Sequence, residues 1–420
     1  MLLALVVVPT SLVFAAPKPV PQAPKPPLKI QQIELFQQLP AARAETLRGL
    51  VERFNAQSPN AQVVLVDRGW RTPNVPHLLI LDDAEEDAFL SGKARYKPLY
   101  ALMKEAGAAL QTLRPPAMME RSPLDGKGQL LALPVGLSTP VLYLNRDALR
   151  KVGVDPDTVR LVTWADLQAA LGQLASAGHA CPYTVAEPGR VMVENLSAWH
   201  DHPLIAAQGG KQRAMFNSML QVKHIAQMAS WVRATYLHIF ATRADAEGRF
   251  ARGECAVIAA PSDSWVDFRR QGGFDLGVVH LPHYDDFAGA PQNTFADGPA
   301  LWVAAGKKAP EYKAVASFVR FWLAAENQVR WQRETGYLPL NRAGLMAAES
   351  ELLGADLENI RVAVSQLVTR PVTRNSTAVA LNGSGKLRRI LDEELAGVWA
   401  DSTAAKTALD NAVSRVSAGR

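Results

Sequence analysis

The stretch that decides the fold is LPVGLSTPVLYLN, residues 133–145. It is an unbroken apolar and β-branched run that is too short for a buried helix, so it predicts a strand buried on both faces. Pro134 and Pro140 each lack a backbone donor and therefore interrupt a regular central strand. A strand that enters one sheet and leaves in another has this pattern. We interpret Ser138 as the hinge between two α/β lobes and expect the functional site in the cleft between them.

The size and composition of the chain fit two soluble lobes. Its 420 residues exceed what one hydrophobic core usually supports. Hydrophobic residues make up 48% and charged residues 20%, which is typical of a soluble globular protein. The net charge is +5, but the basic residues are scattered singly, so the sequence does not indicate a nucleic-acid partner.

The N-terminal residues predict export. Residues 1–16 form an apolar segment that ends in small residues, and Val13-Phe14-Ala15 suits a signal-peptidase site. The segment is too short for a membrane span. A buried N-terminal helix is the alternative, but the proline-rich stretch 17–28 that follows cannot pack as a helix. We interpret 1–16 as a signal peptide and 17–28 as a linker, and we expect the protein in the periplasm.

Two cysteines, Cys181 and Cys255, each precede an expected strand, at 182–185 and 256–259. An exported protein meets an oxidising compartment, where the two thiols can pair. Two separate buried thiols are the alternative. If the chain is exported, we favour the disulfide.

The first hundred residues predict a mostly parallel sheet. Strands are expected at 30–36, 62–66 and 77–81, with helices between and after them. Ligands in such sheets bind beyond the carboxyl ends of the strands. Asp82 and Asp83 lie at such an end, and the alternative role for these residues is a helix N-cap. Later in the chain, Thr163 and Asp166 predict a capping box at the start of a helix.

Two more stretches, 274–282 and 335–340, are interpreted as further crossings between the lobes. The resulting boundaries place residues 29–137 and 280–335 in the first lobe, and residues 138–279 and 336–420 in the second lobe. The expected fold class is therefore α/β, with crossing hinge strands between two lobes.

Four motifs carry a resemblance to a known family. They are STPVLYLN at 138–145, ENLSAW at 194–199, TGYLP at 335–339 and DEELAGVW at 392–399. The pattern resembles the extracellular solute-binding proteins of bacterial ABC transporters, which have the type II periplasmic fold shared with maltose-binding protein. Within this family it is most similar to the glycerol-3-phosphate-binding subgroup, and the placement of the two cysteines also resembles that subgroup.

The resemblance implies a function in transport. It implies a monomer that captures a small polar solute, glycerol 3-phosphate or a related glycerophosphodiester, and delivers it to the transmembrane subunits of an ABC permease, with no cofactor, bound metal or catalysis. The alternatives are a sugar- or oligosaccharide-binding protein of the same family and a degenerate binding scaffold. An exported enzyme is the rival class, but the sequence contains no nucleophile elbow or metalloprotease motif.

The resemblance also implies ligand contacts. The family's positions fall on Ser138, on Ser262 or Ser264, on Gly298, Gly336 and Tyr337, and on Asp82 or Asp83. The arginine expected to bind phosphate falls on Ala380, and alanine cannot replace its bidentate contact. The expected tryptophan falls near Glu187 or Arg190. Arg370, Arg374 and Arg190 are the candidates to supply the missing charge, and we expect glycerol 3-phosphate to bind weakly or not at all.

Overall fold

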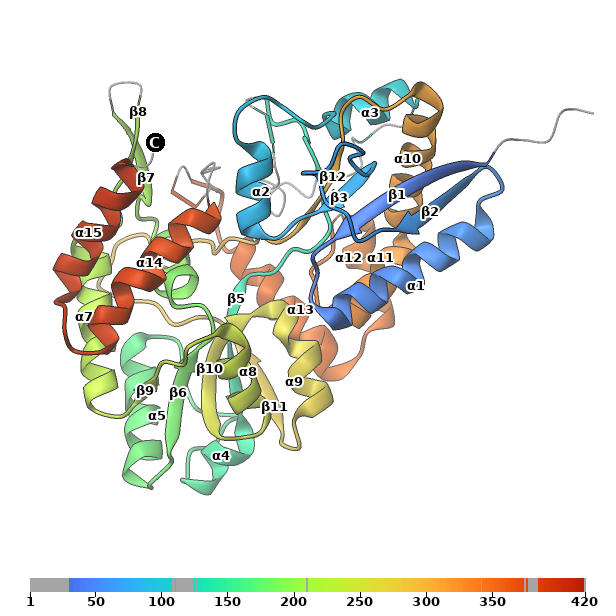
Figure 1. Ribbon diagram of the computed structural model, residues 1–420. Coiled ribbons are helices and arrows are strands. Elements are labelled where there is room, and N and C mark those ends of the chain that lie inside the picture. The colour runs from blue at the N-terminus through green and yellow to red at the C-terminus, as the bar shows by residue number, and fades with distance from the viewer. Residues whose placement is uncertain are drawn as a thin grey trace, which may run out of the picture.

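The computed structural model describes residues 30–107, 110, 124–125, 127–208, 211–340, 342–373, 375–376 and 384–418. The expected signal peptide and linker, Ala380 and Arg374 lie outside these residues. Within them the chain forms two five-stranded sheets and one two-stranded hairpin, with helices around them (Figure 1). None of the helices in this part of the chain is long and apolar enough to cross a membrane.

The first sheet has the strand order β2-β1-β3-β12-β4. Strand β1 is parallel to β2 and β3, whereas β12 is antiparallel to β3 and β4. The sheet is mixed because β12, which comes from a much later part of the chain, runs antiparallel to its two neighbours. Its strands are β1 (Gln31–Gln37), β2 (Ala61–Leu65), β3 (Leu78–Ile80), β4 (Leu133–Pro134) and β12 (Ala300–Val303). The helices of this lobe are α1 (Ala41–Gln57), α2 (Asp83–Leu90), α3 (Leu99–Glu105), α10 (Ala309–Trp322), α11 (Ala325–Thr335) and α12 (Arg342–Glu351).

The second sheet has the order β11-β5-β10-β6-β9. Its central strand β10 is buried along its whole length, which its run of small and apolar residues allows. The strands are β5 (Pro140–Asn145), β6 (Cys181–Val185), β9 (Leu237–His238), β10 (Cys255–Pro261) and β11 (Leu276–Val279). The helices that pack on this sheet are α4 (Arg146–Lys151), α5 (Trp164–Ser176), α7 (Met219–Arg233), α8 (Arg243–Ala251) and α13 (Gly354–Leu367). Helix α5 begins with the expected capping box of Thr163 and Asp166.

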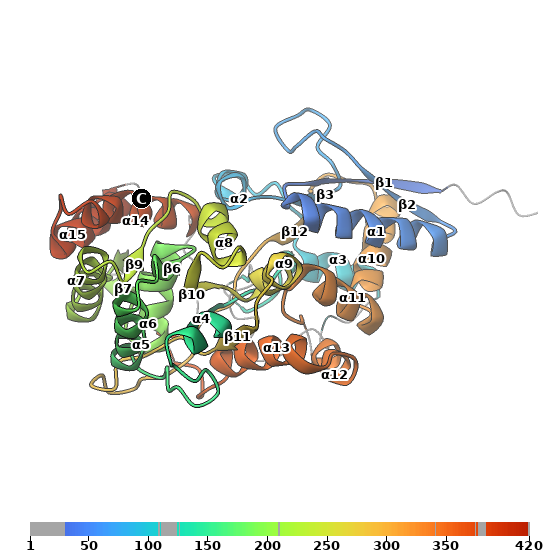
Figure 2. The same cartoon turned by 90° about the horizontal axis from the view of Figure 1, so that it is seen from below.

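The remaining elements extend the second lobe. The C-terminal helices pack against each other and against α7, and the two views show this helical group beside the second sheet (Figures 1 and 2). Helix α2 of the first lobe reaches this group, where Asp87 accepts a hydrogen bond from the backbone N–H of Lys386 at 3.1 Å. The elements that extend the second lobe are the π-helical turn η2 (Arg190–Asn195), α6 (Leu196–Trp199), β7 (Ile205–Gln208), β8 (Lys211–Ala214), the 3₁₀ turn η3 (Ser262–Ser264), α9 (Trp265–Gln271), α14 (Ser384–Trp399) and α15 (Ala405–Ala418).

The stretch 133–145 crosses between the sheets as expected. Strand β4 pairs with β12 in the first sheet, and β5 pairs with β10 and β11 in the second. The five residues between them belong to neither sheet. Ser138 lies in this segment and forms an isolated antiparallel bridge with Asp297. The two prolines mark where one strand ends and the next begins, and this explains why the run is not one continuous strand.

Two later segments lie beside this crossing. Asp297 bridges to Ser138, and Leu338 bridges to Leu137. The stretch 274–282, expected as a crossing, contains β11, which pairs with β5 at the edge of the second sheet. Leu281 and Tyr284 belong to the core of the second lobe. We therefore propose that the chain returns to the first lobe at 294–299.

Gln366 of α13 links the first crossing to the proposed return at 294–299, through its side chain and its backbone carbonyl. The amide Nε2 of Gln366 donates to the carbonyl of Pro140 at 2.8 Å, and its Oε1 accepts from the N–H of Leu281 at 2.6 Å. The backbone N–H of Thr294 donates to the carbonyl of Gln366 at 2.9 Å. The backbone groups that leave the sheets at the hinge therefore find partners in one fully buried glutamine.

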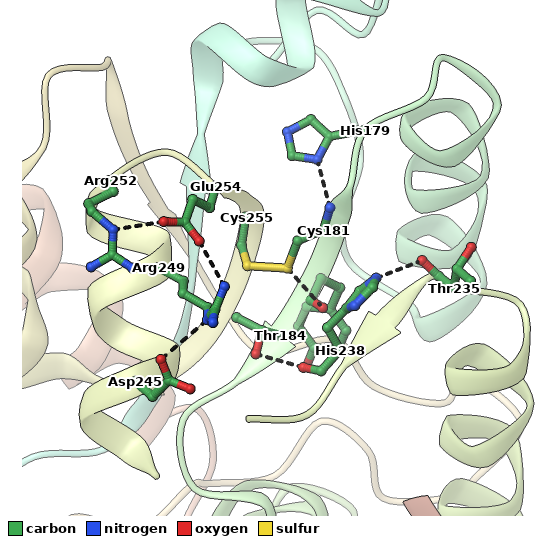
Figure 3. Close-up of a disulfide and its surroundings, with 11 residues drawn as sticks. His179, Cys181, Thr184, Thr235, His238, Asp245, Arg249, Arg252, Glu254 and Cys255 are labelled. Atoms are coloured by element: carbon green, nitrogen blue, oxygen red, sulfur yellow. Dashed lines mark hydrogen bonds and ion pairs between the residues drawn. A yellow bond between two sulfur atoms is a disulfide. The ribbon is translucent and has the colours of Figure 1, made fainter. Parts of the chain in front are cut away.

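The expected disulfide is confirmed. Cys181 and Cys255 face each other at the start of the parallel strands β6 and β10, with their Cα atoms 4.5 Å apart (Figure 3). The register of these two strands places Cys181 opposite Cys255, and this brings the two sulfur atoms together. The N–H of Cys181 also donates to Nδ1 of His179 at 3.3 Å.

Removal of the disulfide tests its contribution to stability. The bond closes a loop with a sequence separation of 74 residues. For a loop of this length the chain-entropy model gives a loss of about 4 kcal/mol in the free energy of unfolding. We expect this loss in the double variant Cys181→Ser, Cys255→Ser, measured by urea denaturation of the exported protein. Reduced wild-type protein is the matched control and should unfold at the same urea concentration as the variant. An unchanged midpoint in both would contradict the prediction.

Candidate functional site

Ion pairs join the two lobes at the crossings. Among the described residues, four arginines and six carboxylates are linked in one continuous series, which we call the junction network. It runs from α1 of the first lobe, through η3, α8 and η2, to the second crossing and α14. Its members are Arg43, Arg190, Arg243, Arg388, Glu187, Glu194, Glu247, Asp263, Asp267 and Asp297.

The network begins on the first lobe with Arg43. Its Nη1 lies 2.5 Å from Oδ2 of Asp267, and its Nη2 donates to the carbonyl of Asp263 at 3.0 Å. Arg43 stands in the first turn of α1, where a positive charge is unfavourable to the helix dipole. Helix stability therefore gives no reason for an arginine at this position. Its partners are on the second lobe, so these ion pairs connect the lobes directly.

Arg243, at the start of α8, forms the middle of the network. Its Nε pairs with Glu247 at 2.8 Å, its Nη2 with Asp263 at 3.3 Å, and its Nη1 lies 3.7 Å from Oε1 of Glu187. Burial alone would raise the pKa of Asp263, but Arg243 and Arg43 outweigh it and hold this pKa below its usual range. Burial raises the pKa of Glu247 against the opposing effect of Arg243.

At the hinge the network passes through Arg190 and Asp297. Arg190 donates from Nη1 to Glu187 at 2.9 Å and from Nη2 to the carbonyl of Ser138 at 2.8 Å. Asp297 accepts from both Arg190 and Arg388. Arg388 also pairs with Glu194 through its Nε at 2.8 Å. The π-helical turn η2 carries Arg190 and Glu194, and this rare form is frequent at functional sites.

The three expected serines lie at this junction, and all are buried. Oγ of Ser138 accepts from Arg190 at 3.3 Å, and Oγ of Ser262 accepts from the N–H of Thr139 at 3.3 Å. Oγ of Ser264 donates to Glu247 at 2.6 Å. The structure therefore brings the serines together, with their hydroxyls bonded to the hinge or to the junction network.

The expected glycines and tyrosine also lie at the crossings. A Cβ on Gly298 would lie 1.6 Å from the carbonyl oxygen of Gly136, and a Cβ on Gly336 would lie 2.5 Å from that of Asp263. Both positions therefore require glycine because another backbone approaches closely. The ring of Tyr337 stacks on that of Trp331, with centroids 6.3 Å apart, and burial raises the pKa of this tyrosine.

The two expected aspartates are at a different place in the first lobe. Asp82 is the N-cap of α2, because its Oδ1 accepts from the N–H of Glu85 at 2.9 Å. The structure therefore shows Asp82 in its alternative role, as a helix N-cap. Asp83 is the first residue of α2, and its side chain lies outside the described structure.

Two of the candidates for the missing positive charge, Arg190 and Arg370, lie in different places and have different partners. Arg190 belongs to the junction network, whereas Arg370 donates to the carbonyl of Gly289 at 3.0 Å. The sequence interpretation missed Arg43, Arg243 and Arg388. The position of Arg43 in the first turn of a helix is a signal that could have found it. The other two carry no local signal, because their roles depend on partners far away in the sequence.

Substitution of Gly298 tests the close packing of the crossings. In the Gly298→Ala variant the new methyl group would force the first and second crossings apart. We expect a loss of roughly 2 kcal/mol or more in the free energy of unfolding, measured by urea denaturation. Gly306→Ala is the matched control, because Gly306 also has a positive φ, of 78°, but its Cβ would meet no atom within 4 Å. The control should lose about 1 kcal/mol from backbone strain alone. Equal losses in the two variants would refute the close approach.

Comparison with known proteins gives consistent matches. The model of the family described as bacterial extracellular solute-binding protein matches residues 85–349. The chain is 31% identical over 386 residues to the sn-glycerol-3-phosphate-binding periplasmic protein UgpB of Pectobacterium atrosepticum, covering 88% of this chain and 86% of the relative. It is 29% identical over 405 residues to the protein of the same name from Yersinia pestis, covering 92% of each chain.

Two solved structures show the same fold. One is UgpB from Mycobacterium tuberculosis in complex with glycerophosphocholine, with a TM-score of 0.75 and 22% identity over 92% of this chain and 98% of the other. The second is maltose-bound MalE3 of T. maritima, with a TM-score of 0.73 and 15% identity over 93% of this chain and 100% of the other. The expected two-lobed α/β architecture of type II periplasmic binding proteins is thereby confirmed.

Proposed function

The chain belongs to the family of bacterial extracellular solute-binding proteins, and on this premise we propose that it captures a small polar solute between its lobes and delivers it to a membrane ABC permease. The proposal places the protein in the periplasm and gives it a binding role without catalysis. It includes the permease as partner because the relatives are periplasmic binding proteins.

The observation that supports this proposal most strongly is the junction network. It puts charged and hydroxyl groups from the first lobe, the hinge and the second lobe at one place. A solute bound there contacts both lobes at once and so binds the closed state more tightly than the open state. Because the groups at this junction are ionic and hydroxylic, they suit a polar solute rather than an apolar one.

We propose a glycerophosphodiester as the solute, in preference to glycerol 3-phosphate. The phosphate-binding arginine of the subgroup falls on Ala380, and every arginine in the junction network already pairs with carboxylates. Loss of one charge-assisted contact costs roughly 1.5–3 kcal/mol, about a tenfold to hundredfold loss of affinity. A diester carries less negative charge than the phosphate monoester, and it therefore loses less affinity when this arginine is missing. Arg243 is the arginine of the network with the greatest exposure, and we propose that it meets the phosphate.

A sugar is the second candidate. Its support is the structural likeness to a maltose-bound protein, and this likeness is at the level of the fold. Polar side chains at the junction also suit hydroxyl groups of a sugar. A sugar, maltose, is therefore one of the solutes with which binding is tested.

Thermal denaturation of the exported protein with a panel of solutes tests the proposed function. The panel contains glycerol 3-phosphate, glycerophosphocholine and maltose. A ligand at about 100 times its dissociation constant adds about 2.7 kcal/mol of stability. We expect a clear upward shift of the melting temperature with glycerophosphocholine and a much smaller shift with glycerol 3-phosphate at equal concentration. A large shift with micromolar glycerol 3-phosphate would contradict the preference for a diester, and no shift with any solute would contradict the binding role.

Two arginines on the same helix provide a matched pair for this experiment. Arg243→Gln should weaken binding of glycerophosphocholine in calorimetric titration. Arg249→Gln is the control, because Arg249 pairs with Asp245 and Glu254 outside the network. Equal affinities of the two variants would remove Arg243 from the site.

A further inference from the structure

A contact between α2 and α14 joins the two lobes outside the segment where the chain crosses. Oδ2 of Asp87 in α2 accepts a hydrogen bond from the backbone N–H of Lys386 in α14 at 3.1 Å. Helix α2 belongs to the first lobe and α14 to the second, and both views show α2 beside the beginning of α14 (Figures 1 and 2). The contact therefore links the lobes through two helices that are not part of the crossing.

The position of Lys386 gives this hydrogen bond a defined role. Lys386 is the third residue of α14, a helix of 16 residues. The first N–H groups of a helix have no acceptor within the helix, and a side-chain oxygen near the helix start usually accepts from one of them. For Lys386 this oxygen comes from the other lobe. A carboxylate at this end also interacts favourably with the helix dipole. Asp87 therefore caps α14 from across the interface between the lobes.

Helix α2 itself gives no reason for an aspartate at position 87. Asp87 is the fifth of the eight residues of α2, and the N-cap of this helix is Asp82. Aspartate is a weak helix former, and a negative charge in the second half of a helix opposes the helix dipole. The contact with α14 is thus the feature of the structure that explains this aspartate.

The turn of α14 that Asp87 caps also carries a member of the junction network. Arg388 follows Lys386 by two residues, pairs with Glu194 through its Nε at 2.8 Å, and donates to Asp297. The first lobe and the hinge therefore hold the beginning of α14 from two directions. Loss of the cap would loosen this turn and change the position of Arg388 at the junction.

We propose that Asp87 is a positioning residue for solute binding, which stabilises the closed arrangement of the lobes without touching the solute. The inference rests on the proposed function, because it concerns a solute held between the lobes. The lobes must part to admit or release such a solute, and the hydrogen bond between Asp87 and Lys386 breaks when they part. Its free energy therefore adds to the stability of the closed complex. We expect the effect in the dissociation rate of the solute.

Two substitutions of Asp87 test this role, with glycerophosphocholine as the probe. Asp87→Ala removes the acceptor, and the usual cost of losing a helix cap corresponds to an increase of about fivefold in the dissociation constant. Stopped-flow tryptophan fluorescence should show this increase as faster dissociation, with the association rate within about twofold of wild type. Asp87→Asn keeps an oxygen that can accept, and asparagine caps helices about as well as aspartate. This variant should therefore stay within about twofold of the wild-type affinity.

Glu85→Ala on the same helix is the matched control. Glu85 accepts from Nε1 of Trp70 at 2.8 Å and pairs with Arg71 at 3.1 Å, and both partners lie in the first lobe. The control should lower the melting temperature of the free protein and leave the dissociation rate of the solute unchanged. An unchanged dissociation rate in Asp87→Ala, or equal increases in Asp87→Ala and Glu85→Ala, would overturn the inference and leave the proposed function intact.

Amide hydrogen exchange of the wild-type protein gives a second test, which holds even if Asp87→Ala does not fold. The backbone N–H of Lys386 should exchange more slowly with glycerophosphocholine bound than without it, because the solute stabilises the closed arrangement. Equal exchange of this amide with and without bound solute would overturn the inference. If the wild-type protein binds no solute of the thermal panel, the proposed function fails, and the inference fails with it.

Discussion

Asp297 holds the hinge in place. Its backbone bridges to Ser138, and its carboxylate accepts from Arg190 and Arg388. One residue therefore connects the first two crossings to η2 and to α14. Because Arg190 also pairs with Glu187, the same contacts extend to Arg243 and, through Asp263, to Arg43 on the first lobe. The arrangement of the junction depends on this residue more than on any other.

Stability alone does not explain such a network. Largely buried ion pairs lose much of their solvation, and apolar residues of similar size often serve a core equally well or better. The chain also uses apolar packing, in one cluster that runs from the first sheet across the crossing into the second sheet and in another within the second lobe. Charged residues gather where the lobes meet, beside the crossing at 133–145. This placement fits a surface that must part, admit a polar solute and close again, and it supports our proposal that the network is the binding site.

The sequence was sufficient for the architecture and insufficient for the site. Local pattern identified the crossing at 133–145, because two prolines interrupt an apolar run there, and it identified the capping box of Thr163 and Asp166. At 274–282 the same kind of pattern marks β11, an edge strand of the second sheet. Arg43, Arg243 and Arg388 meet only in the folded chain, so neither spacing nor propensity could group them. Asp82 shows a second limit of local pattern, because a capping aspartate and a ligand-binding aspartate look alike in sequence, and the structure shows the cap.

The most direct test of the central claim is a crystal structure of the exported protein with its bound solute. The account predicts electron density for the solute between the lobes, with an anionic group on Arg243. It also predicts that Asp297 keeps its contacts with Arg190 and Arg388. Density for the solute away from the junction network, or a solute bound there without contact to Arg243, would contradict the account.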